Sequence, residues 1–197
     1  MKQYLRKFLQ AERIVVELGM GDGRLLAELA KEYEGDRSVA YVGIEKDKNL
    51  VNRAKMRLNS QSAIGINSMF EKTLILFHDK SIDLIIMVLP DPNYIDPIHY
   101  DKWSEFYGQL VYSKLKNYGI LKIVTEIIDD LLEPVSDELY SRQVNWLIET
   151  FSGLGFRLID KKDGPPNGYS SIYLDKFGAD SARIRIVTLD LGKHNLT

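Results

Sequence analysis

The chain has 197 residues, 45% hydrophobic and 27% charged, which predicts one globular domain over residues 1–197 and excludes a disordered or disulfide-dependent chain. With 26 basic and 28 acidic residues the net charge is −2, which excludes nucleic-acid binding by bulk charge, so an RNA partner requires a local basic patch. There is no cysteine, and His78, His99 and His194 are too scattered to indicate a metal site. No apolar run reaches the ~18 residues of a membrane span, so we expect a cytoplasmic protein with no membrane partner.

Strand-like and helix-like segments alternate along the chain. After an N-terminal helix over 1–11, we expect strands over 14–18, 39–44, 63–66, 82–89 and 119–125, with helices over 23–33, 50–58, 70–77 and 99–116. A helix over 135–154 precedes two final strands over 156–159 and 184–189. This alternation predicts a doubly wound parallel sheet, and the final pair of strands predicts one antiparallel strand. The insert over 163–182 is interpreted as a flap over the substrate pocket, or else as a surface loop.

A glycine-rich turn, Glu17-Leu18-Gly19-Met20-Gly21-Asp22-Gly23, follows the first strand. Glycine lets the backbone turn tightly and lets a ligand approach without obstruction by a Cβ atom. An acidic residue before the glycines would repel a pyrophosphate but suits an ammonium group, so the pattern favours S-adenosylmethionine over NAD. Glu45 ends the second strand, where a carboxylate can accept hydrogen bonds from both ribose hydroxyls.

On these residues the chain resembles the Rossmann-fold S-adenosylmethionine-dependent methyltransferases over nearly its whole length. The resemblance implies an enzyme with S-adenosylmethionine as its cofactor. It also implies an α/β fold with a mixed seven-stranded sheet of order 3-2-1-4-5-7-6 and helices on both faces. The cofactor-binding residues that it implies are Glu17, Gly19, Gly21, Gly23, Glu45, Lys46, Asn67, Ser68 and Leu89.

Two prolines flank an acidic residue after the fourth strand, in Pro90-Asp91-Pro92. Proline fixes φ, so the pair stiffens the loop around Asp91. A rigid carboxylate beside the reacting methyl group can orient a nucleophilic nitrogen or accept its proton, which makes Asp91 the candidate catalytic residue. An ordinary proline-rich turn with an exposed aspartate is the alternative.

The same phrase, with Thr125-Glu126 downstream, resembles the tRNA (guanine-N7-)-methyltransferases, whose motifs are F-P-D-P-W and T-D. Asn67-Ser68 is similar to their N-A, and residues 171–177 are similar to their T-x-F-E-x-K-F stretch. The resemblance implies a guanine N7 in tRNA or a related RNA as acceptor, with Glu126 accepting hydrogen bonds from the guanine N1–H and N2–H₂ groups. The substrate-binding residues that it implies are Pro92, Asn93, Tyr94, Thr125, Glu126 and Asp175.

The chain departs from that family in the loop over 90–105. Asn93 replaces the tryptophan, and the family's basic cluster is replaced by four acidic residues and one base: Asp91, Asp96, Asp101, Glu105 and Lys102. Phosphate contacts drive RNA affinity, so we expect this loop to weaken RNA binding. Basic residues elsewhere either compensate or form ordinary surface, namely Lys2, Arg6, Lys7, Arg183 and Arg185.

The loop that contains Asp91 is also compatible with other methyl acceptors. Asp91-Pro92-Asn93-Tyr94 approximates the Asp/Asn-Pro-Pro-Tyr/Phe motif of amino-group methyltransferases, in which the aromatic ring stacks on the base. The acceptor would then be an exocyclic amino group of a base, or a nitrogen of a protein or small molecule. The alternative outside the enzymes is a non-catalytic binding module that holds S-adenosylmethionine. A monomer and a homodimer are equally compatible with the sequence.

Overall fold

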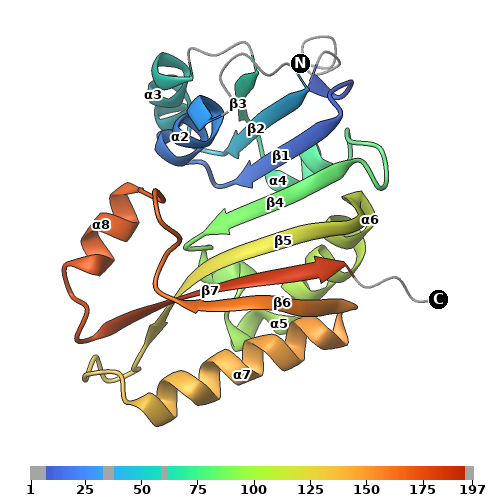
Figure 1. Cartoon of the computed structure of the whole chain (residues 1–197). Helices are drawn as coiled ribbons and strands as arrows, with labels where there is room; N and C mark the ends of the chain where they lie inside the picture. The colour runs from blue at the N-terminus through green and yellow to red at the C-terminus, as the bar shows by residue number, and fades with distance from the viewer. Residues whose placement is uncertain (1–7, 33–37, 59–61, 194–197) are drawn as a thin grey trace.

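A computed structural model of the chain describes residues 8–32, 38–58 and 62–193, and its strands form one sheet (Figure 1). The strands are β1 (Arg13–Leu18), β2 (Val39–Glu45), β3 (Ala63–Asn67), β4 (Ile82–Val88), β5 (Leu115–Ile128), β6 (Phe156–Asp163) and β7 (Ile184–Lys193). Their order is β3-β2-β1-β4-β5-β7-β6. The first five pair in parallel, whereas β7 runs antiparallel to both β5 and β6. The predicted mixed sheet and its strand order are confirmed.

The helices alternate with the strands, as predicted. They are α2 (Arg24–Glu32), α3 (Lys48–Arg57), α4 (Phe70–Leu74), α5 (Tyr100–Glu105), α6 (Tyr112–Lys114), α7 (Asp137–Gly153) and α8 (Ile172–Gly178). Short helical turns are η1 (Pro92–Tyr94), η2 (Pro97–His99) and the π-helix η3 (Phe106–Val111), which joins α5 to α6. Within the described ranges, no helix has both the length and the apolar character needed to cross a membrane. Residues 1–7 of the helix expected over 1–11 lie outside the described residues.

Two hydrophobic clusters hold the helices on opposite faces of the sheet. The larger cluster includes Trp103, Tyr107 and Phe151, which lie fully buried on α5, η3 and α7. The smaller cluster packs Leu26 of α2 and Ala54 of α3 against the other face. Trp103 is therefore a core residue, and its indole N–H donates to the Asp96 carbonyl at 2.8 Å.

Some element bounds differ from those expected. β5 begins at Leu115 rather than at 119, and β6 continues to Asp163 through polar residues. Leu115 pairs with Ile82 of β4, which brings the start of β5 into the sheet before the apolar pattern begins. Pairing with β7 extends β6, because the antiparallel pairing continues where the apolar pattern has already ended. The helix expected over 99–116 is instead a series of short segments joined by η3.

Candidate active site

A pocket of about 540 Å³ opens at the carboxyl ends of β1, β2, β4 and β5. Its volume is in the range of small-molecule sites. Figure 1 shows α8 beyond the carboxyl ends of β1 and β4, and the segment over 170–177 forms one wall of the pocket. The pocket brings together these predicted site residues: Glu17, Gly19, Gly21, Glu45, Lys46, Leu89, Asp91, Pro92, Tyr94 and Glu126.

The three glycines of the turn after β1 have positive φ but lie in different surroundings. Gly19 (φ 78°) and Gly21 (φ 55°) line the pocket. Gly23 (φ 76°) is not in the pocket wall, and a Cβ atom there would lie 2.8 Å from the Cβ of Ala54 in α3. The start of α2 can therefore approach α3 only because residue 23 is glycine.

Glu17 is a buried acid in the wall of the pocket, with 3% of its surface exposed. Burial raises its pKa to about 8, and the nearby charges of Asp22 and Glu45 add to the effect. Its Oε2 atom has no hydrogen-bond partner among the described residues. A buried carboxyl oxygen without a partner is costly unless a ligand satisfies it, and an ammonium group can do so. The Glu17 carboxylate, as a hydrogen-bond acceptor, therefore fits the cationic amino-acid part of S-adenosylmethionine.

Glu45 ends β2 with its carboxylate held by two backbone donors. The Gly21 N–H donates to its Oε2 at 3.2 Å, and the Asp47 N–H donates to its Oε1 at 2.8 Å. The Asn67 side-chain amide donates to the carbonyls of Glu45 and Lys46 at 3.1 and 2.9 Å. Asn67 thus braces the end of β2, and neither it nor Ser68 is in the pocket wall.

The loop after β4 begins in an unusual backbone conformation. Leu89 has a φ of 51°, a value that non-glycine residues seldom adopt, and its N–H donates to the Val124 carbonyl at 2.7 Å. The Asn93 side chain and backbone N–H donate to Asp91 at 2.6 and 3.1 Å, and these bonds lower the pKa of Asp91. The Lys46 Nζ lies 3.9 Å from the Asp91 carboxylate. Asp91 is therefore an ionised carboxylate at the pocket, and Asn93, outside the pocket wall, fixes its orientation.

Tyr94 lines the pocket but belongs to an aromatic cluster. Its ring lies 5.2 Å from the rings of both Phe70 and Phe106, and its hydroxyl donates to Glu71 at 2.8 Å. Burial raises the pKa of Tyr94, as does the bond to Glu71. The phenol is accordingly neutral, and its orientation is determined by contacts within the fold.

Glu126 reaches the pocket from β5, whereas Thr125 and Asp175 are not in its wall. Burial raises the pKa of Glu126. Thr125 is 1% exposed, and its hydroxyl lies 3.5 Å from the Glu126 carboxylate. Asp175 lies on α8 and contacts Arg24 at 3.0 Å.

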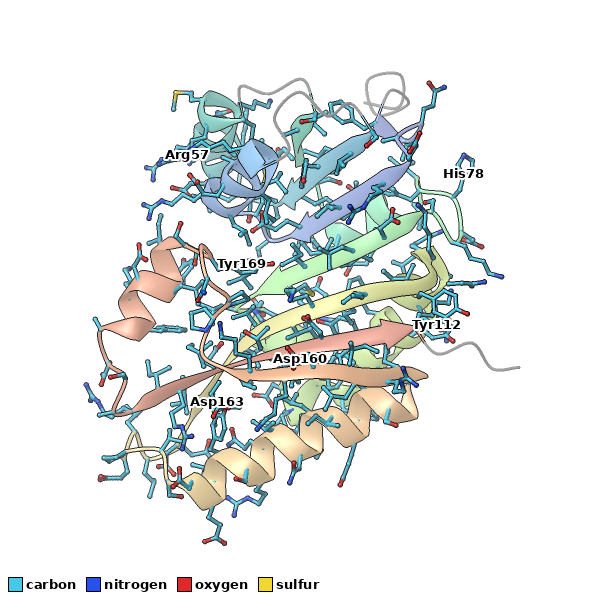
Figure 2. The ribbon with its side chains drawn as sticks, in the orientation of Figure 1. Arg57, His78, Tyr112, Asp160, Asp163 and Tyr169 are labelled. Carbon is cyan, nitrogen blue, oxygen red and sulfur yellow. The ribbon has the colours of Figure 1, made fainter. Side chains whose placement is uncertain are left out.

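Several pocket residues were not assigned to the site from sequence. They are Met69, Phe70 and Arg24, with Ser170, Ser171, Ile172, Tyr173 and Phe177 from the segment around α8. The length of the insert over 163–182 is the signal that indicates the second group. Figure 2 shows Tyr169, in the chain leading to α8, lying over the sheet near β4, where it packs against the smaller hydrophobic cluster. In the part of the chain that the structure describes, no group of three His, Cys, Asp or Glu side chains could hold a metal ion.

A family model described as "Putative methyltransferase" matches residues 11–143, about two thirds of the chain. The chain belongs to this methyltransferase family. It is an S-adenosylmethionine-dependent methyltransferase, as the glycine turn and its acidic neighbours predict. The match covers β1 to β5 and the segments that connect them, which together form most of the pocket wall.

Individual relatives agree with this assignment. A tRNA (guanine-N(7)-)-methyltransferase of Macrococcus caseolyticus is 26% identical over 190 residues, covering 90% of this chain and 81% of that protein. A carboxy-S-adenosyl-L-methionine synthase of Nautilia profundicola is 29% identical over 126 residues, 62% of this chain and 50% of the synthase.

Solved structures share the fold at lower identity. The 16S rRNA methyltransferase KamB has a TM-score of 0.73 at 12% identity, with 98% of this chain and 93% of that chain covered. A 16S rRNA (adenine(1408)-N(1))-methyltransferase variant from Catenulisporales acidiphilia has a TM-score of 0.70 at 16% identity, with 98% and 91% covered. These likenesses support the Rossmann-like methyltransferase fold.

Proposed function

We propose that this methyltransferase acts on N7 of a guanine in tRNA. The observation that carries the proposal is the 26% identity to a tRNA (guanine-N(7)-)-methyltransferase over 190 residues. Of the matching motifs, Pro90-Asp91-Pro92 follows β4, and Thr125-Glu126 lies near the end of β5, the neighbouring parallel strand. Asp91 and Glu126 consequently lie in the wall of one pocket.

We assign three roles in the recognition of S-adenosylmethionine to residues of the pocket. Glu17 binds the ammonium group of the methionine part, since its Oε2 has no hydrogen-bond partner within the described ranges. Gly19 and Gly21 let the ligand approach the backbone closely. Glu45 receives the ribose hydroxyls, because two backbone N–H groups already hold its carboxylate in place.

Methyl transfer to guanine N7 depends on the positioning of the base more than on proton transfer. S-adenosylmethionine supplies an electrophilic methyl group, and guanine N7 offers an in-plane lone pair with no proton to remove. The residues of the pocket therefore have to hold the base in line, and such alignment can supply ~7–11 kcal/mol of a barrier. Glu126, once ionised, accepts the N1–H and N2–H₂ donors and directs N7 toward the methyl group.

The environments of Asp91 and Tyr94 support a ring nitrogen over an amino group. The pKa of Asp91 is lowered by its bonds from Asn93, which makes it a poor base, and an acceptor without a proton does not require one. Amino-group methyltransferases of this type stack the base on an aromatic ring. Here the ring of Tyr94 packs against the rings of Phe70 and Phe106 in one cluster, which competes with stacking on a base.

The test is incubation of the enzyme with S-adenosylmethionine and an unmodified tRNA transcript, followed by digestion to nucleosides and mass spectrometry. We expect 7-methylguanosine to form with the wild type and to be strongly reduced with Asp91→Ala. Formation of a different methylated nucleoside would overturn the N7 assignment. No methylation of any tRNA, alongside methylation of a protein or small molecule, would overturn the substrate class.

A further inference from the structure

The part of the pocket around Glu17 is strongly acidic. Glu17, Asp22 and Glu45 all line the pocket, and the charges of the other two add to the rise in the pKa of Glu17. This environment suits the ammonium group of the methionine part of S-adenosylmethionine. The same amino acid, however, has a carboxylate on the carbon atom that bears the ammonium group. An acidic wall repels that carboxylate, so its binding requires a cation close to Glu17.

Two of the described residues that line the pocket are basic, Arg24 and Lys46. Lys46 follows β2, its side chain is 68% exposed, and its Nζ lies 3.9 Å from the Asp91 carboxylate. Arg24 is the first residue of α2, and its side chain is half as exposed, at 33%. The backbone of Leu26, in the same turn of α2, is hydrogen-bonded to the Glu17 carboxyl. Arg24 is therefore the pocket cation that lies on the Glu17 side.

The Arg24 guanidinium is held in position and still has free donors. Its Nε donates to Asp22 at 3.2 Å, and its Nη1 donates to Asp175 at 3.0 Å. A guanidinium has five N–H donors, so three are left, and both of those on Nη2 are among them. None of these three donates to a described residue. Because the Asp22 side chain is only 6% exposed, it gives the guanidinium a fixed anchor, and a fixed guanidinium binds a carboxylate with high geometric specificity.

Asp22 also has a second cationic partner, which lies outside the pocket wall. The Nη2 of Arg57, at the end of α3 (Figure 2), lies 3.2 Å from the same carboxylate oxygen that Arg24 contacts. Both arginines thus neutralise Asp22, but only Arg24 lines the pocket. This pair separates a structural role at Asp22 from a contact with the ligand.

The position of the amino-acid part is indicated independently by Glu17. Its Oε2 is buried and has no hydrogen-bond partner among the described residues. A buried polar atom without a partner is costly, so a ligand group that satisfies it is expected at this point of the pocket. An ammonium group there places the attached carboxylate at the start of α2, where the free donors of Arg24 lie.

We propose that Arg24 binds the carboxylate of the methionine part of S-adenosylmethionine, beside the ammonium group bound by Glu17. The two side chains together form a receptor for the zwitterion, and the pocket thereby discriminates against adenosyl ligands that lack the carboxylate. The inference rests on the role given to Glu17 under the proposed function. It does not depend on the methyl acceptor.

The test measures the binding of two ligands to the full-length protein by calorimetry at pH 8. The ligands are S-adenosylmethionine and decarboxylated S-adenosylmethionine, which lacks the carboxylate and keeps the ammonium and sulfonium groups. The proteins are the wild type, Arg24→Gln and the matched control Arg57→Gln, since each variant removes one cationic partner of Asp22. Thermal melts show whether each variant is folded, and the comparison of the two ligands on the wild type is informative without any variant.

For the wild type, we expect S-adenosylmethionine to bind about 10- to 100-fold more tightly than the decarboxylated ligand, as hydrogen bonds between charged groups allow. Arg24→Gln should raise the Kd for S-adenosylmethionine by a similar factor and change that for the decarboxylated ligand by less than about two-fold. Arg57→Gln should keep the preference of the wild type. Equal binding of the two ligands by the wild type, or equal weakening of both in Arg24→Gln, would overturn the inference.

A third variant separates this inference from the role of Glu17. Both ligands carry the ammonium group, so Glu17→Gln should weaken both equally and retain the preference for S-adenosylmethionine. Unchanged binding of both ligands in Glu17→Gln, with the preference still lost in Arg24→Gln, would overturn the role of Glu17 and leave that of Arg24. Failure to methylate tRNA would overturn the proposed acceptor and leave both binding results as they are.

Discussion

The Arg24 guanidinium lies 3.0 Å from the Asp175 carboxylate and so joins the start of α2 to α8. The same guanidinium contacts Asp22 of the glycine turn at 3.2 Å. One side chain therefore links the cofactor side of the pocket to the segment that closes its other side. Both partners of the pair are partly exposed, so it contributes at most ~1 kcal/mol and can open and close readily.

Removing this link should release α8 while leaving the rest of the fold in place. For Asp175→Ala we expect S-adenosylmethionine to dissociate about 2- to 5-fold faster, as the loss of an exposed ion pair allows. Stopped-flow fluorescence measures that rate, and limited proteolysis measures the opening of α8. Asp180→Ala removes a comparable ion pair beyond α8, with Arg183, and should change neither readout. An unchanged dissociation rate, together with a raised KM for tRNA, would instead make Asp175 a substrate contact.

Binding of the cofactor should release a proton from Glu17. Its pKa of about 8 keeps the free carboxyl protonated at pH 7, whereas an ammonium partner requires the carboxylate. Affinity should therefore rise between pH 6 and pH 8, by up to about ten-fold per pH unit. Calorimetry in buffers of different ionisation enthalpy measures the proton released. Glu17→Gln should bind more weakly and lose this pH dependence, and a dependence that survives in that variant would contradict the role of Glu17.

The stability of the protein without cofactor should also depend on the ionisation of Glu17. The pKa of Glu17 is raised on folding from its ordinary value of 4.5, so its contribution to stability is lost as the pH rises from about 4.5 to about 8. Glu17→Gln stays neutral and should be more stable than the wild type by roughly 3–5 kcal/mol at pH 8, with little difference at pH 4. Denaturant unfolding at the two pH values tests this. A variant less stable than the wild type at pH 8 would contradict the burial argument.

The glycines of the turn should separate into structural and ligand-facing positions. Gly23→Ala bears the strain of positive φ and also places a Cβ atom 2.8 Å from that of Ala54, so we expect a loss of roughly 2–5 kcal/mol in stability. Gly21→Ala has no atom within 4 Å of its new Cβ and bears only the strain of positive φ, about 1–2 kcal/mol. Gly21→Ala should mainly lower cofactor affinity, because residue 21 lines the pocket. Thermal melts and calorimetry distinguish these effects, and equal behaviour of the two variants would contradict the division.

Asp91 should matter for turnover and little for cofactor binding. Asp91→Ala is expected to lower kcat about 100-fold through misplacement of the acceptor, with the Kd for S-adenosylmethionine unchanged. Asp101→Ala removes a neighbouring exposed acid on α5 and serves as the control, with an expected change of less than two-fold. Comparable loss in both variants would show a general effect of loop charge.

The sequence predicts the sheet and the position of the site because both depend on local signals. Alternating apolar and helical segments predict the doubly wound sheet, and the family resemblance implies its strand order. Glu17 and Glu45 are placed by the ends of the first two strands. Contacts between residues that are distant in sequence cannot be predicted from local signals. The ion pair of Arg24 with Asp175 is an example, because the two residues are 151 positions apart. Gly21 and Gly23 look alike in sequence, and only the packing of Ala54 separates them.

The most direct test of the acceptor atom uses two versions of one tRNA transcript, made with guanine or with 7-deazaguanine, in which carbon replaces N7. The enzyme is given labelled S-adenosylmethionine, and methyl transfer to each transcript is measured alongside binding. We expect transfer to the guanine transcript, no transfer to the 7-deazaguanine transcript, and similar binding of both. Equal transfer to the two transcripts would contradict the N7 assignment.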